Sequence, residues 1–149
     1  MNSMLSVYAL CVVVLCVKMV AISCYQGFYR ISSLAFTNSE DARYFNRPVH
    51  HHELPQVCRA AKAWANDLEN IPLFFVLGGL CCVLATWSVP AIGLFCLFTV
   101  ARVLHTVLYL AGWQPWRTVA YAVGIVCLSG LAGMVAYKAT VGASLLAIF

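Results

Sequence analysis

Four long apolar segments constrain the fold of this chain more than any other feature. They cover roughly residues 4–28, 66–87, 89–111 and 118–149 of a 149-residue sequence. A helix needs about 20 predominantly apolar residues to cross the hydrocarbon layer of a membrane, and each segment meets that length. A composition of 63% hydrophobic and 9% charged residues excludes an ordinary water-soluble domain. The sequence therefore predicts an all-α integral membrane protein, a bundle of four transmembrane helices.

The first apolar segment is predicted to remain in the mature protein as a membrane helix. No basic residue precedes its apolar core, and Lys18 lies inside it, so it does not follow the pattern of a secretory signal peptide. A polar stretch, residues 38–55, lies in the connection of about residues 29–62 between the first two helices. We expect residues 1–149 to form a single transmembrane domain.

Basic residues are concentrated in two of the connections between these segments. The first connection contains Arg30, Arg43, Arg47, Arg59 and Lys62, and the connection before the fourth helix contains Arg117. In a four-helix chain both connections lie on the same side, and basic loops favour the cytoplasmic side. We expect both termini on the opposite side. This distribution explains the net charge of +4 without a nucleic-acid partner.

Cysteine and histidine do not follow the spacing of a disulfide framework or a metal site. Seven of the eight cysteines lie in apolar segments and only Cys58 lies in a connection, which is typical of small packing residues. His50, His51 and His52 are consecutive, so their side chains cannot all face one ion, and no Cys or carboxylate spacing completes a ligand set. We expect no metal site.

Polar residues recur at helical spacing near the cytoplasmic ends of three segments. A spacing of three or four residues places side chains on one face of a helix. The polar faces comprise Lys62, Asn66 and Glu69 at the second helix, Arg102, His105 and Tyr109 with Thr106 on the third, and Arg117 and Tyr121 with Thr118 on the fourth.

The cost of burying charge in a membrane predicts that these three faces meet. An Arg, Lys or Asp at the centre of a membrane helix costs about 2.5 to 3.5 kcal/mol, and such residues mark functional sites by default. The alternative is a structural ion pair, for example between Arg102 and either Glu69 or Asp67. Both interpretations place the polar residues in the interior of the bundle.

A pocket built from these side chains suits a small zwitterionic peptide. Cationic donors are available for carboxylates, acidic groups can receive an ammonium, and the remaining polar groups give directional hydrogen bonds. Apolar helix walls suit a lipophilic second substrate arriving from the bilayer. The cations are Arg30, Lys62, Arg102 and Arg117, the acids Asp67 and Glu69, and the neutral groups Asn66, His105, Tyr109 and Tyr121.

Four motifs occur in a fixed order along nearly the whole chain. They are AFTNSEDA at residues 35–42, NDLENIP at 66–72, ARVLHTVLY at 101–109, and QPWR at 114–117 followed by Tyr121. In this order and spacing they resemble the MAPEG family, the membrane-associated proteins in eicosanoid and glutathione metabolism. The resemblance is to the branch of the microsomal glutathione transferases and prostaglandin E synthases, rather than to the leukotriene C4 synthase branch.

The resemblance implies a homotrimer that binds glutathione between neighbouring subunits at the cytoplasmic side. It implies that Arg117 activates the glutathione thiol, that Thr118 stands where the family has Ser, and that Asp41 matches an acidic position proposed to act with the Arg. It also implies the endoplasmic reticulum or outer mitochondrial membrane in a eukaryote, or the inner membrane in a bacterium. The positions implied to contact glutathione or support its pocket are Arg30, Asn66, Glu69, His105, Tyr109, Arg117, Thr118 and Tyr121.

The chain departs from the family pattern just before Asn66. Lys62 replaces an Arg and lacks the planar guanidinium, Trp64 replaces a His, and Ala65 has no polar group where some members have Arg.

The resemblance, together with this departure, leaves three functions open. The first is a glutathione transferase for lipophilic electrophiles, with lipid peroxidase activity included; the alternatives are a prostaglandin E synthase and a non-catalytic lipid-binding scaffold. A haem-binding bundle is disfavoured, because His105 is the only histidine within an apolar segment.

Overall fold

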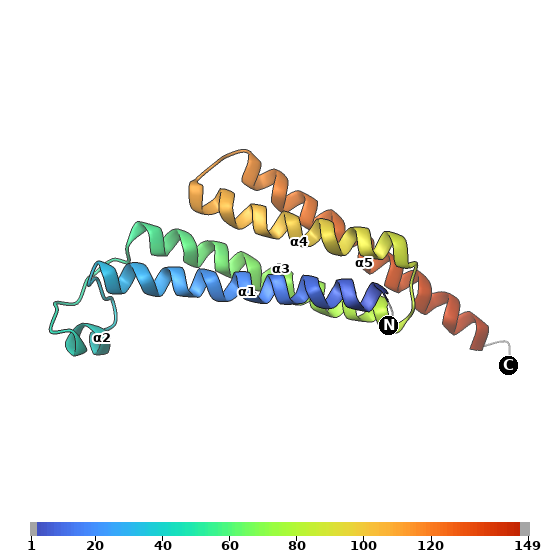
Figure 1. Ribbon diagram of the computed structural model, residues 1–149, viewed down its shortest axis with the longest axis horizontal. Coiled ribbons are helices and arrows are strands. Elements are labelled where there is room, and N and C mark those ends of the chain that lie inside the picture. Colours follow the sequence, from blue (N-terminus) through green and yellow to red (C-terminus); the bar gives the residue numbers. More distant parts are fainter. Residues whose placement is uncertain (1–2, 147–149) are drawn as a thin grey trace.

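Four long helices and one short helix make up the computed structural model, which describes residues 3–146 (Figure 1). Each long helix is long and apolar enough to cross a membrane, so the predicted all-α membrane bundle is confirmed. The helices are α1 (Ser3–Ser32), α2 (Ser39–Tyr44), α3 (Pro55–Val83), α4 (Ser88–Ala111) and α5 (Trp116–Leu146).

The second long helix begins earlier than the apolar pattern predicts. It starts at Pro55 instead of Asn66, about three turns earlier. Proline suits the first helical turn because its fixed φ is already helical and its missing N–H needs no partner there. The predicted connection of residues 29–62 is therefore shorter, about residues 33–54, and it contains α2. The predicted end of the fourth helix at Phe149 lies outside the described residues.

The two basic connections lie at the same end of the bundle. Figure 1 shows the α1–α3 connection, with α2, and the α4–α5 turn at one end, and the beginning of α1 and the end of α5 toward the other. This arrangement agrees with the predicted placement of the basic loops on one side. The assignment of that side to the cytoplasm stays a prediction.

Helices α3 and α4 form the centre of the bundle, because each packs against the other and against both α1 and α5. The core is aromatic: the rings of Phe74 and Phe98 stack with centroids 4.6 Å apart, and Phe95 meets Phe74 edge to face at 5.8 Å. All eight cysteines are free thiols, as predicted, but only Cys11, Cys81 and Cys127 pack in the core.

Gly78 lets α1 approach α3 closely. A methyl group at this position would lie 2.6 Å from the ring of Tyr8 and 3.3 Å from Phe95. The ring cannot easily move aside, because the Tyr8 hydroxyl donates to the backbone oxygen of Phe75 at 2.6 Å. Small residues at such contacts are typical of membrane helix pairs.

We expect Gly78→Ala to lower the stability of the bundle by about 1 to 3 kcal/mol, the usual cost of overpacking. Thermal unfolding in detergent measures the effect. Gly93→Ala is the matched control, because a Cβ at Gly93 meets nothing within 4 Å. Equal melting temperatures for the two variants would contradict the close packing of Tyr8 on α3.

Candidate functional site

A buried polar layer joins α1, α3 and α4 at the carboxylate of Asp67. One oxygen of Asp67 accepts from Arg102 Nη2 at 2.6 Å, and the other pairs with the Lys18 ammonium and accepts from Thr106 Oγ1 at 3.5 Å. Arg102 Nη2 also donates to Asn66 Oδ1 at 2.6 Å. We call Lys18, Asn66, Asp67, Arg102 and Thr106 the buried polar layer.

The buried polar layer is a structural ion-pair network. The side chains of Asp67 and Arg102 have no exposed surface. Buried charges of this kind remain ionised only when they are paired and hydrogen-bonded. Of the two interpretations of Arg102, the structure shows the ion pair with Asp67.

Six predicted site residues surround one cavity of about 230 Å³ beside this layer. They come from the polar faces of α3, α4 and α5, so these three faces converge as predicted. We call it the inner cavity; its lining is Asn66, His105, Tyr109, Arg117, Thr118 and Tyr121. His105 is 3% exposed, and its Nδ1 has no hydrogen-bond partner among residues 3–146.

A second cavity, of about 470 Å³, opens toward the α4–α5 turn. It shares Tyr109 and Arg117 with the inner cavity, so the two cavities are adjacent. We call it the loop cavity; its lining is Pro55, Cys58, Arg59, Lys62, Tyr109, Gly112, Gln114 and Arg117. Its polar lining is dominated by three cationic side chains.

Arg117 lies between the two cavities and is held by neutral neighbours. Its guanidinium carbon lies 4.4 Å from the centre of the Tyr109 ring, a cation–π contact. Gln114 accepts from Arg117 Nε at 3.1 Å and donates to Thr118 Oγ1 at 3.1 Å, in the amide orientation that satisfies both neighbours. No described carboxylate pairs with Arg117, so its positive charge is available to an anion.

The sequence relationships agree with this geometry. Residues 8–137 match the model of the MAPEG family. The chain belongs to the MAPEG family. Prostaglandin E synthase of Homo sapiens is 32% identical over 136 residues, covering 91% of this chain and 90% of the relative. The Bos taurus prostaglandin E synthase is 30% identical over 139 residues, 93% of this chain and 91% of the relative. Microsomal glutathione S-transferase 1 of Homo sapiens is 35% identical over 112 residues, 72% of each chain.

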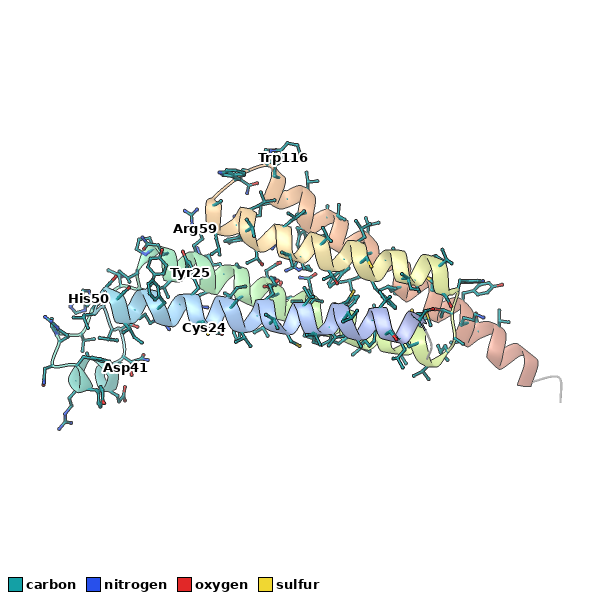
Figure 2. The ribbon with its side chains drawn as sticks, in the orientation of Figure 1. Cys24, Tyr25, Asp41, His50, Arg59 and Trp116 are labelled. Carbon is teal, nitrogen blue, oxygen red and sulfur yellow. The ribbon has the colours of Figure 1, made fainter. Side chains whose placement is uncertain are left out.

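Five residues named from the sequence lie away from the two cavities of this MAPEG chain. Asp67 and Arg102 lie in the buried polar layer. Glu69 is exposed on the outside of α3, and Arg30 lines a separate cavity of about 310 Å³ beside Trp64. Asp41 is exposed on α2; Figure 2 shows it far from Trp116, the residue before Arg117. The fold of the single chain therefore does not bring Arg30, Glu69 or Asp41 to Arg117.

Arg30 is already paired with a carboxylate of its own chain. Its Nε donates to Glu53 at 3.0 Å and its Nη2 to the same oxygen at 2.5 Å. The pair is partly exposed, 38% for the Arg30 side chain and 20% for Glu53. The other oxygen of Glu53 is buried with no hydrogen-bond partner among the described residues.

Sequence reasoning missed Arg59 and the contacts of Gln114. Arg59 precedes Lys62 by three residues, so it continues the polar face of α3 by one turn. The helix was predicted to begin at Asn66, which left Arg59 in a loop and hid that spacing. Gln114 belongs to the QPWR motif, but no sequence pattern predicts the hydrogen bonds that its side chain forms with Arg117 and Thr118.

Proposed function

We propose that this MAPEG protein is a membrane-bound glutathione transferase that conjugates glutathione to lipophilic electrophiles. The observation that carries the proposal is Arg117, a guanidinium without a described carboxylate partner between two adjacent cavities near the loop end of the bundle. Together the cavities offer cations for the two carboxylates of glutathione and neutral polar groups for its amides. The relatives named for glutathione transfer and prostaglandin E synthesis support the same class.

In this proposal Arg117 holds the glutathione sulfur as a thiolate. An unperturbed thiol has a pKa near 8.5, and an adjacent guanidinium lowers such a pKa by about 1 to 3. The thiol proton leaves to solvent, and Thr118 Oγ1 donates a hydrogen bond to the sulfur. The thiolate then attacks the electrophilic carbon; a carbon–sulfur bond forms as the leaving group departs with its electron pair.

With a lipid hydroperoxide the thiolate attacks the terminal oxygen, and a second glutathione completes the reduction to alcohol, water and glutathione disulfide.

We propose a homotrimer as the form that completes the site. Tyr121 and Thr118 are exposed in the single chain although they line the inner cavity, and Glu69 is exposed on α3. A neighbouring subunit covers these polar groups and brings its own Arg30 and Asp41 toward Arg117 in this arrangement. Closed symmetric assemblies of this kind bury polar faces that would otherwise meet lipid. We propose the endoplasmic reticulum or outer mitochondrial membrane for this trimer in a eukaryote, and the inner membrane in a bacterium.

Calorimetric titration of the detergent-purified protein with glutathione tests the proposal. Saturable binding is expected, and S-methylglutathione should bind more weakly because it cannot form the thiolate. No binding of either ligand would reject the transferase and favour the lipid-binding scaffold of the same fold, in which Trp64 and Ala65 no longer support the peptide.

Prostaglandin E synthesis is the second candidate, because the Homo sapiens prostaglandin E synthase covers 91% of this chain, against 72% for the glutathione transferase. Incubation of the protein with prostaglandin H2 and glutathione, followed by product analysis, separates the two. Prostaglandin E2 formation at a rate above that of conjugation to a model electrophile would make the isomerase the principal activity.

The pair of Arg30 and Glu53 predicts a gain of affinity on loss of the carboxylate. In Glu53→Gln the guanidinium is free for a carboxylate of glutathione, and partly exposed pairs are worth about 0.2 to 1 kcal/mol. We therefore expect the Kd for glutathione to fall about two- to fivefold by calorimetry. Arg30→Ala in the same background should abolish the gain; a gain that survives would mean that Glu53 acts on another group.

A further inference from the structure

A third cavity extends the loop cavity to the edge of the bundle. It has a volume of about 190 Å³, lies between α1, α3 and the end of α4, and shares Pro55 and Arg59 with the loop cavity. The three cavities therefore form a row of adjacent cavities from the edge through the loop cavity to the inner cavity. We call it the cationic groove.

Arg59 lies where the edge of the cationic groove joins the loop cavity, and Arg117 lies where the loop cavity joins the inner cavity. Figure 2 shows Arg59 between α3 and the α4–α5 hairpin. Its guanidinium passes directly over the backbone of Gly112, where a Cβ would collide with it. Gly112 has a φ of 74°, the left-handed conformation that ends α4. Glycine therefore both permits this conformation and leaves room for the guanidinium of Arg59.

The charged residues that line the cationic groove are all positive. Arg59, Lys62 and Arg117 line it, and no Asp or Glu is among the described residues of its three linings. Neither Arg59 nor Lys62 forms an ion pair within residues 3–146. A cleft lined by one sign of charge concentrates ligands of the opposite sign and raises their association rate by about 10- to 1000-fold.

We propose that Arg59 steers glutathione into the cationic groove and sets its association rate, ahead of the contacts with Lys62 and Arg117. The inference rests on the proposed function and adds the access route and its first cation. Glutathione carries two carboxylates and one ammonium, so it is a net anion before its thiol ionises. A charge at the rim of a binding site acts on association and its salt dependence more than on dissociation.

Stopped-flow association of an S-bimane glutathione conjugate, whose fluorophore is uncharged, with the full-length protein in detergent, followed by fluorescence anisotropy, tests the proposal. We expect Arg59→Gln to slow association about threefold to tenfold at about 0.01 M salt and to change dissociation less than twofold. At about 1 M salt, where the Debye length is about 3 Å, the two proteins should associate at similar rates. The dimethyl ester of the same probe lacks both carboxylates and keeps the ammonium, so Arg59→Gln should not slow its association.

Arg47→Gln is the matched control, because it removes the same charge from an exposed residue of the α1–α3 connection that does not line the groove. Equal association rates for Arg59→Gln and Arg47→Gln would overturn the steering role, as would a loss confined to the dissociation rate. Failure of the wild-type protein to bind glutathione in the calorimetric titration would instead overturn the proposed function, and the steering role with it.

Discussion

Replacing Arg117 by Ala is expected to lower the rate of glutathione conjugation near neutral pH by about 10- to 100-fold. The guanidinium is the unpaired cation between the inner and loop cavities, and it favours the thiolate over the thiol. Without it the sulfur returns to a pKa near 8.5, so only a few per cent is ionised at pH 7. The fold should remain intact, because Arg117 has no described carboxylate partner and its guanidinium contacts the Tyr109 ring and the turn residue Gln114.

The pH profile of this variant distinguishes loss of thiolate from loss of structure. Because the cation lowers the thiol pKa, wild-type activity should already be on its plateau at pH 7. The variant rate should rise about tenfold per pH unit until it levels near pH 8.5. Arg117→Lys keeps the charge and should retain more activity than Arg117→Ala at pH 7. A uniform loss at every pH, without recovery, would remove thiol activation from the role of Arg117.

Replacing Asp67 by Ala should cause the largest loss of stability in the protein. The change leaves the Lys18 ammonium and the Arg102 guanidinium buried together without the carboxylate that pairs with both. Removing one member of a buried ion pair typically costs about 3 to 5 kcal/mol. Thermal unfolding in detergent should therefore show a strongly lowered melting temperature or no folded protein.

A second substitution keeps this prediction testable if the variant does not fold. Lys18→Met in the Asp67→Ala background removes one of the two uncompensated charges and should recover part of the stability. Glu40→Ala, which removes an exposed carboxylate from α2, is the control and should unfold as the wild type does. Wild-type stability of Asp67→Ala alone would mean that the two cations are neutralised by another route.

The sequence predicted the part of the site that depends on helical periodicity. Asn66 follows Lys62, Tyr109 follows His105 and Tyr121 follows Arg117, each by four residues. This spacing fixes the face of a helix once its ends are known. Arg59 lies on the same periodic face, but it was missed because Pro55, not the hydropathy pattern, determines where α3 begins. Local composition thus predicted the membrane helices better than their first turns.

The roles of Arg102, Arg30 and Asp41 depend on tertiary contacts that no local pattern contains. Arg102 and His105 share a helical face, yet Arg102 turns to Asp67 and His105 lines the inner cavity. Arg30 pairs with Glu53, which is 23 residues further along the chain in a connection without regular spacing. Asp41 lies on a six-residue helix apart from the bundle, so its partner cannot be derived from one chain.

The pairing of Lys18 with Asp67 also constrains how the protein is made. The two residues are 49 positions apart, so α1 leaves the ribosome well before the middle of α3. Until α3 enters the membrane, α1 carries an ammonium without its carboxylate, a cost of a few kcal/mol for a helix in lipid. The first helix therefore reaches its full stability in the membrane only after α3 has inserted, and a chain truncated before Asp67 should leave α1 less stable.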